Sequence, residues 1–193
     1  TVDTSEVSDS EISSSSEISD AKADDSNAET SKANDETAAQ LQTPGWTTRE
    51  DGTTGYQNED GSLCADTIKE IDGNLYYFNE DGALVKDDVF RYNYDYYKAS
   101  EDGSLYRSCW DGYSYYDQNG KQQRNCIIEL NGKYYGFNSE GQRYENKTFY
   151  FFDADDICTY YHAQEDGTLA TNAWLRYETQ DFYLGANGAS IRG

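Results

Sequence analysis

The stretch "IDGNLYYFNEDGAL", residues 71–84, places an aromatic run between two glycine turns. Asp72-Gly73 and Asp81-Gly82 are pairs typical of tight turns, because glycine adopts positive φ without a steric cost. The run between them contains adjacent tyrosines and a phenylalanine, which are residues that strands favour. The stretch therefore predicts a strand, a tight turn, a second strand and a second turn, with no helix.

Similar text recurs along the chain. The best copies are "YYKASEDGSL" from Tyr96 and "YYHAQEDGTL" from Tyr160, and the worn copies begin at Tyr115, Tyr134 and Phe182. The turn glycines of the successive copies are Gly61, Gly82, Gly103, Gly120, Gly141, Gly167 and Gly188. Their intervals are 21, 21, 17, 21, 26 and 21 residues, and a period held over so many units indicates a repeat architecture.

The predicted fold class is all-β. A single two-stranded hairpin is marginally stable in water, so the units are expected to stack and bury their aromatic faces against one another. We therefore predict a stacked β-hairpin solenoid of about seven repeats of about 21 residues. Adjacent tyrosines point to opposite faces of a strand, so one of each pair should be in the core and the other exposed.

Composition divides the chain into two parts. Residues 1–43 are rich in Ser, Asp, Glu, Ala and Thr, and up to Gln42 they contain 11 acidic residues against Lys22 and Lys32 and no aromatic residue. Such a segment cannot bury enough apolar surface to offset its ordering entropy, so we predict a disordered acidic tail or linker. Residues 44–193 contain all 19 Tyr, 7 Phe and 3 Trp and form the predicted repeat domain.

The charge of the chain restricts its partners. The formal net charge is −22. A field of that sign repels phosphate backbones and anionic lipid, which excludes nucleic acid as a partner and leaves neutral sugars and cationic groups open. No apolar run approaches the length of a membrane span, so no membrane insertion is expected.

Four cysteines and one histidine make a zinc site improbable, because none of the cysteines forms a C-x-x-C pair. Two interpretations of the cysteines remain: they form disulfides in an exported protein, or they are free buried thiols. Cys109 and Cys126 each lie six residues after a turn glycine in consecutive units, so we predict a disulfide between them. Cys64 and Cys158 would then pair or remain free.

The stretches "IDGNLYYFNEDGAL" and "LNGKYYGFNSEGQ" (residues 130–142) resemble the cell-wall-binding repeats of Gram-positive surface proteins. That superfamily includes choline-binding modules, glucan-binding repeats and the repetitive domains of clostridial toxins. The resemblance covers roughly residues 45–193. It implies an exported, non-catalytic left-handed hairpin solenoid with about three hairpins per turn, whose ligands lie between successive repeats against aromatic side chains.

The chain departs from that family at one position of the repeat, and it does so in most units. A choline cage of the family uses a Trp after a Gly, because aromatic faces hold a quaternary ammonium. Here Gly45-Trp46 alone keeps this pair. The corresponding places hold Ile68, Val89 or Phe90, Trp110, Ile127, Phe149 and Trp174. Choline is therefore not the first ligand that the sequence suggests.

The three tryptophans are evenly spaced, because 64 residues separate Trp46 from Trp110 and Trp110 from Trp174. With three hairpins per turn they would share one side of the solenoid, each beside tyrosines of the following hairpin, such as Tyr115 and Tyr116 beside Trp110. They would form platforms for sugar rings, or alternatively they fill core positions. The predicted ligand-binding residues are Trp46, Trp110, Trp174, Tyr77, Tyr97, Tyr115, Tyr116, Tyr135, Tyr161 and Tyr183.

Catalysis and metal binding have weak support. The recurring Glu-Asp-Gly places carboxylates on hairpin tips, where the pattern is first a turn signal, so no glycosidase pair is inferred. His162 has no recognisable nucleophile partner. Asp153, Asp155 and Asp156 match no EF-hand spacing, and a solvated acidic insertion explains them as well. We predict no catalytic residues, no cofactor and no metal.

The sequence therefore predicts a secreted or wall-associated, non-catalytic repeat module that binds carbohydrate through shallow aromatic sites. The ligand would be a bacterial cell-wall polymer, a glucan or a host glycan, because many unequal copies of one aromatic unit favour multivalent weak binding. The alternative is a structural spacer or an adhesin-type module with degenerate sites, whose partner would be a surface protein.

Overall fold

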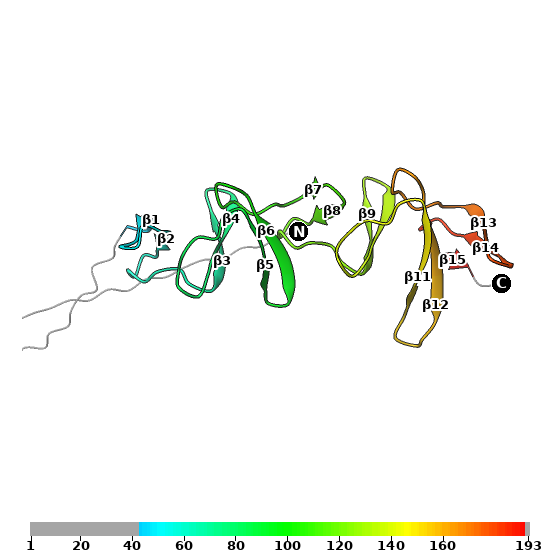
Figure 1. The fold of residues 1–193 in the computed structure, drawn as a ribbon, viewed down its shortest axis with the longest axis horizontal. Coiled ribbons are helices and arrows are strands. Elements are labelled where there is room, and N and C mark those ends of the chain that lie inside the picture. The colour runs from blue at the N-terminus through cyan, green and yellow to red at the C-terminus, as the bar shows by residue number, and fades with distance from the viewer. Residues whose placement is uncertain (1–42, 192–193) are drawn as a thin grey trace, which may run out of the picture. The chain divides into compact units, whose positions relative to one another are not determined.

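The structure is a computed structural model in which residues 43–191 are described, and these residues form short strands and turns (Figure 1). The predicted tail, up to residue 42, lies outside the described residues. Residues 43–191 contain no helix, and so none that is long and apolar enough to cross a membrane. The all-β class predicted from the sequence is confirmed for this part of the chain.

Fourteen strands of the described region pair in chain order as seven antiparallel hairpins. The hairpins, numbered here from 1 to 7, are β1 (Gly45–Thr48) with β2 (Thr54–Gln57), β3 (Thr67–Ile71) with β4 (Asn74–Phe78), β5 (Asp88–Tyr92) with β6 (Asp95–Ala99), β7 (Cys109–Asp111) with β8 (Ser114–Tyr116), β9 (Cys126–Leu130) with β10 (Lys133–Phe137), β11 (Lys147–Phe152) with β12 (Cys158–Ala163), and β13 (Ala173–Tyr177) with β14 (Gln180–Leu184). A last short strand, β15 (Ser190–Ile191), pairs with β14.

The tight turns of hairpins 2 and 5 have the predicted left-handed backbone at both turn residues. In hairpin 2, Asp72 and Gly73 have φ of 51° and 82°, which is the geometry that an Asp-Gly pair favours. Hairpin 3 departs from this pattern, because Asn93 and Tyr94 carry the two positive φ angles, 47° and 71°, without a glycine. A bulky residue with positive φ is strained, so the register of β5 with β6 holds this turn against local preference.

A second turn follows each of hairpins 2 to 6 and brings the chain back to the preceding hairpin. After hairpin 2, the Gly82 amide donates to the Asn79 carbonyl at 2.8 Å, and the Leu84 amide then donates to the Thr54 carbonyl of hairpin 1 at 2.7 Å. The same bond to the preceding hairpin is made by Leu105 to Leu75, Gln122 to Tyr96, Arg143 to Tyr113 and Leu169 to Tyr134. Backbone hydrogen bonds therefore join each of hairpins 2 to 6 to the hairpin before it.

Small aromatic clusters, rather than one central core, stabilise the fold. Phe78 and Phe137 at the ends of β4 and β10 are fully buried. Between hairpins 2 and 3, Phe90 stacks on Tyr77 with 4.4 Å between ring centroids and on Tyr97 with 5.6 Å. Because each cluster is built from neighbouring hairpins, burial of apolar surface also joins each hairpin to the next.

The irregular intervals of the repeat correspond to hairpins of different length. β7 and β8 have three residues each, where the interval is 17, whereas β11 and β12 have six each, where the interval is 26. At the tip of the long hairpin, Asp153 Oδ1 accepts hydrogen bonds from the amides of Asp155 and Ile157, both at 2.9 Å. The acidic insertion thus has a turn-forming role in this structure.

The predicted disulfide between Cys109 and Cys126 is wrong, because both residues are free thiols. Each cysteine begins the first strand of its own hairpin, opposite Tyr116 and Phe137 respectively. The Cys126 thiol lies 3.7 Å from Gln123 Oε1 as its acceptor. Equal phase in consecutive units places two residues at equivalent positions of different hairpins, which does not bring their Cβ atoms together.

Candidate functional site

One cross-strand pair has the same place in all seven hairpins. It is formed by the second residue of the first strand and the residue opposite it, and side chains so placed share one face of the hairpin. The pair is Trp–Tyr in hairpins 1, 4 and 7: Trp46–Tyr56, Trp110–Tyr115 and Trp174–Tyr183. In the other hairpins it is Ile68–Tyr77, Val89–Lys98, Ile127–Gly136 and Thr148–His162.

The first site, called here the Trp46 site, consists of Trp46, Tyr56, Tyr76 and Phe78. The Trp46 ring lies edge-on to Tyr56 of its own hairpin, with centroids 5.5 Å apart, and edge-on to Tyr76 of the next hairpin at 4.9 Å. Phe78 is buried beneath, 5.9 Å from Trp46. Because 44% of Trp46 is exposed, an indole surface remains open between two hairpins.

The second site, the Trp110 site, repeats this arrangement with Trp110, Tyr115, Tyr135 and Phe137. The ring centroids of Tyr115 and Tyr135 lie 5.1 and 5.2 Å from that of Trp110, and the buried Phe137 lies 5.8 Å from it. Trp110 is 37% exposed. The two sites therefore have the same aromatic residue type at each of four equivalent positions.

Trp174 forms the least complete arrangement of the three. It is 75% exposed and contacts one ring in the described part of the chain, that of Tyr183 at 5.4 Å. The Trp46 and Trp110 sites each obtain a further wall from the hairpin that follows them. In residues 43–191 no hairpin follows hairpin 7, and none of these residues forms the equivalent wall beside Trp174.

The predicted site residues fall into two groups. Trp46, Trp110, Trp174, Tyr115, Tyr135 and Tyr183 belong to the open arrangements just described. Tyr77, Tyr97 and Tyr116 are buried, and Tyr161 is partly buried and stacks on Phe149 at 5.5 Å. The rings of these four pack against neighbouring side chains, so they offer a ligand less open surface than the exposed indoles do. In particular, Tyr116 lies opposite Cys109 and contacts Tyr106, not Trp110.

Sequence reasoning missed Tyr56, Tyr76, Phe78 and Phe137. The signal was present for Tyr56 alone, because the turn within a hairpin fixes which residue lies opposite which, whereas Tyr76, Phe78 and Phe137 belong to the following hairpins. Counting outward from the turn pairs Trp46 with Tyr56 and Trp110 with Tyr115. We expected Tyr115 in the hairpin after Trp110, whereas both residues belong to hairpin 4.

Basic side chains lie close to both sites. Lys69 Nζ is 5.4 Å from the Tyr56 ring centroid and donates to Asn58 Oδ1 at 3.0 Å. The Arg143 guanidinium carbon is 5.0 Å from the Trp110 ring centroid, and Arg143 is also paired with Glu145. Burial raises the pKa of the Tyr115 hydroxyl above its usual range, so this hydroxyl remains a hydrogen-bond donor at neutral pH.

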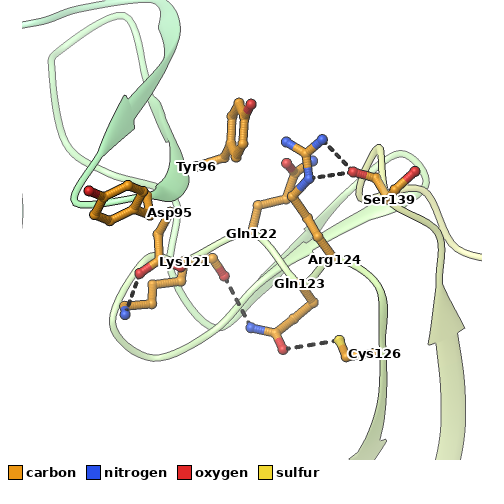
Figure 2. Close-up of a pocket in the computed structure, with 9 residues that line it drawn as sticks. Asp95, Tyr96, Lys121, Gln122, Gln123, Arg124, Cys126 and Ser139 are labelled. Carbon is orange, nitrogen blue, oxygen red and sulfur yellow. Dashed lines mark hydrogen bonds and ion pairs between the residues drawn. The ribbon is translucent and has the colours of Figure 1, made fainter. Parts of the chain in front are cut away.

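A separate open pocket of about 490 Å³ lies between hairpin 3 and residues 121–126 (Figure 2). Tyr96 presents its ring there, but the Arg124 guanidinium covers that ring at 3.8 Å from its centroid. Arg124 is held in place by the Ser139 carbonyl, to which Nε donates at 2.8 Å, and Lys121 is paired with Asp95. The ring of Tyr96 is thus less available for stacking than the indole of Trp46.

Comparison with known proteins identifies the fold. No family model and no curated protein matches the sequence. Among solved structures, CbpJ of Streptococcus pneumoniae has a TM-score of 0.55 at 18% identity, over 77% of this chain and 52% of that one. Choline-binding protein F of the same organism has 0.53 at 18% identity, over 78% and 48%. The modular autolysin LytC of this organism, solved with a synthetic peptidoglycan ligand, has 0.50 at 16% identity, over 76% and 37%.

The matched region spans about half of the length of CbpJ and of choline-binding protein F, and less of LytC. At these identities the likeness concerns the fold. The resemblance predicted from the repeated stretches is thereby confirmed at that level. The repeat region of this chain has the fold of the choline-binding repeat proteins.

Proposed function

We propose that this chain is a non-catalytic module that binds carbohydrate polymer of a bacterial cell wall through shallow aromatic sites between consecutive hairpins. The observation that carries the proposal is the open indole of Trp46, framed by Tyr56 of its own hairpin and Tyr76 of the next. An exposed indole offers a flat apolar face on which a sugar ring stacks, and tyrosine hydroxyls nearby bond to sugar hydroxyls.

The proposed binding is multivalent. The Trp46 and Trp110 sites repeat one geometry, and Trp174 adds a third exposed indole. A polymer that engages several weak sites of one chain is retained more strongly than by any single site, because each later contact is intramolecular. A soluble short sugar should consequently bind weakly even when the polymer is held well.

The order of the hairpins along the chain also supports the proposed carbohydrate binding. We propose that the seven hairpins form a solenoid of about seven repeats of about 21 residues, in which every third hairpin carries a Trp–Tyr pair. Hairpins 2 and 5 then supply the second wall of the Trp46 and Trp110 sites, and hairpins 3 and 6 act as spacers that set the distance between ligand sites. In all four hairpins the equivalent pair, such as Ile68–Tyr77 or Ile127–Gly136, lacks an indole.

The similar proteins supply the proposed ligand class and location. Choline-binding protein F is named for choline, and the LytC structure contains a peptidoglycan ligand. By this likeness we propose that the module is exported and associated with a Gram-positive wall. Choline itself is a second candidate ligand, because the edge-on rings around Trp46 suit a quaternary ammonium as well as a sugar.

The alternative is a spacer or adhesin-type module that binds protein. Four of the predicted platform tyrosines pack against neighbouring side chains and offer less open surface than the indoles, which favours it. The two readings differ at Trp46: in a spacer this indole has no ligand, and its removal changes no binding.

Retention on purified Gram-positive cell walls and on insoluble glucan tests the proposal. Trp46→Ala should lose most of the wall retention, and Trp46→Ala combined with Trp110→Ala should abolish it. Phe152→Ala is the matched control, because Phe152 is an exposed aromatic residue on the tip of hairpin 6, away from the Trp–Tyr pairs. Competition with choline and with soluble wall fragments then separates the two ligand classes. Equal retention of wild type and the double variant would overturn the proposal.

A further inference from the structure

The Trp46 and Trp110 sites have the same aromatic walls but different neighbours at one position. Leu84 and Arg143 each lie two residues after a turn glycine, and each donates its amide to the preceding hairpin, to the Thr54 and Tyr113 carbonyls at 2.7 and 2.8 Å. Their side chains also have equivalent surroundings. Leu84 packs over Gly103 and Arg143 over Gly167, the turn glycines of the next hairpins. Position 84 in the first site is thus position 143 in the second.

The two residues differ in what they bring to the indole. Leu84 packs in the apolar cluster around Phe78. Arg143 places its guanidinium carbon 5.0 Å from the Trp110 ring centroid, in the arrangement of a cation over an aromatic face. An aromatic face that already holds a cation has less attraction left for a second one, and like charges repel each other.

Arg143 is held firmly over Trp110. Its guanidinium is paired with Glu145, and its side chain is largely buried. Its stem crosses closely over the turn at Gly167, where the absence of a side chain leaves room for it. A side chain confined at both its stem and its head loses little further entropy by staying in place, so it does not move aside readily for a ligand.

The cation near the other site is held differently. Lys69 Nζ lies over Tyr56 and is bonded to Asn58, and no cation lies over the Trp46 ring among the residues that the structure describes. Trp46 therefore keeps an indole face free of charge, whereas Trp110 does not.

We propose that Arg143 is a specificity-determining residue that closes the Trp110 site to cationic ligands, so that the two aromatic sites of one chain select different groups. The Trp46 site accepts a quaternary ammonium or a neutral sugar. The Trp110 site accepts a neutral sugar edge on what remains of its indole and rejects the quaternary ammonium. This inference rests on the proposed function for the role of both sites, but its test does not use wall retention.

The experiment follows the three indole N–H signals by NMR during titration with tetramethylammonium chloride, after assignment with single Trp→Phe variants. In the wild type, the Trp110 signal should not move. The signal of the exposed Trp174 is the control for non-specific shifts, so the titration is limited to concentrations that leave it unchanged. In Arg143→Leu, which copies position 84, the Trp110 signal should shift and saturate, with a dissociation constant at least about tenfold lower than in the wild type. Arg143→Met is a second variant that keeps an unbranched stem over Gly167.

The converse exchange uses the first site. Leu84→Arg combined with Lys86→Glu recreates the Arg143–Glu145 pair beside Trp46, and it should weaken tetramethylammonium binding at the Trp46 signal about tenfold or more. A Trp110 signal that stays unresponsive in folded Arg143→Leu and Arg143→Met would overturn the inference, as would wild-type Trp110 that already saturates. If Arg143→Leu gains tetramethylammonium binding at Trp110 while the Trp46→Ala, Trp110→Ala double variant is retained on walls as well as wild type, the inference stands and the proposed function fails.

Discussion

Arg143 crosses Gly167 so closely that a Cβ atom on the glycine would lie 2.6 Å from Arg143 Cδ and nearer still to Nε. Gly167 also has φ of +80°, where a side chain is strained even in open space. The turn after hairpin 6 and the Arg143 wall of the Trp110 site therefore depend on each other, because Arg143 occupies the space that a Cβ atom on Gly167 would take.

Gly167→Ala should lower the free energy of unfolding by about 1–3 kcal/mol, because it combines backbone strain with crowding. Gly73→Ala separates the two causes, since Gly73 has φ of +82° with no atom within 4 Å of the added Cβ. It should cost less than Gly167→Ala in urea unfolding. Adding Arg143→Ala to Gly167→Ala should recover the difference, and equal costs of the two glycine variants would show that crowding is unimportant.

The buried phenylalanines should carry more stability than the exposed tryptophans. Phe78→Ala and Phe137→Ala each remove a fully buried ring, and each should lower the free energy of unfolding by about 3–5 kcal/mol. Trp46→Ala should cost less, because nearly half of its surface is already in water. Urea unfolding of the three variants measures this order. If Trp46→Ala proves the most costly, the indole is a packing residue and the Trp46 site loses its basis.

The repeat period and the turns were predictable, because a turn position that needs positive φ favours glycine, and the spacing of these glycines can be counted in the sequence. The turn glycines of the repeat, from Gly61 to Gly188, all have positive φ, and the all-β class follows from their spacing. The identity of the buried tyrosine in each pair was not predictable in the same way. Tyr77 and Tyr97 are buried because Phe90 lies between them, and a contact between hairpins depends on the rotation from one hairpin to the next, which no local pattern specifies.

For the same reason, only part of the candidate site could be predicted from the sequence. The spacing of Trp46, Trp110 and Trp174 was visible in the sequence, and so was the tight turn that pairs each with a tyrosine. The wall from the following hairpin and the guanidinium over Trp110 required the arrangement of hairpins in space. The Cys109–Cys126 pairing was wrong for the same reason, because equivalent positions in consecutive hairpins are not necessarily close in space.

Thiol chemistry provides a further prediction. Burial raises the pKa of the Cys126 thiol above its usual range, which keeps it protonated at neutral pH. Because the thiolate is the nucleophile, Cys126 should be alkylated by iodoacetamide more slowly than a cysteine in an unstructured peptide. Mass spectrometry after timed alkylation measures this rate. Reduction with dithiothreitol should leave the melting temperature unchanged, and a fall on reduction would indicate a disulfide after all.

Acid should weaken the hairpin turns through carboxylates such as Asp102. Its Oδ1 accepts hydrogen bonds from the Ser100 hydroxyl at 2.6 Å, the Ser104 hydroxyl at 2.7 Å and the Ser104 amide at 2.8 Å. Bonds from the Ser100 and Ser104 hydroxyls, and then from the Ser104 amide, favour the ionised form and lower the pKa of Asp102 from 3.8 to about 2. Asp60 and Asp166 have their pKa lowered by the equivalent bonds from Ser62 and Thr168.

A lowered pKa in the folded state fixes the sign of the pH effect. Asp102 in the unfolded chain is ionised above its ordinary pKa, so its stabilising contribution is complete above about pH 4 and is lost as the pH falls toward about 2. Asp102→Asn should therefore be less stable than wild type at pH 7, and the difference should shrink as both are taken to pH 2. Carboxyl NMR titration of Asp102 should give a midpoint near 2. Glu101→Gln is the control, because Glu101 is exposed in the same turn. A midpoint near 4, with a stability difference that does not change between pH 7 and pH 2, would show that the serine hydrogen bonds do not hold the charge.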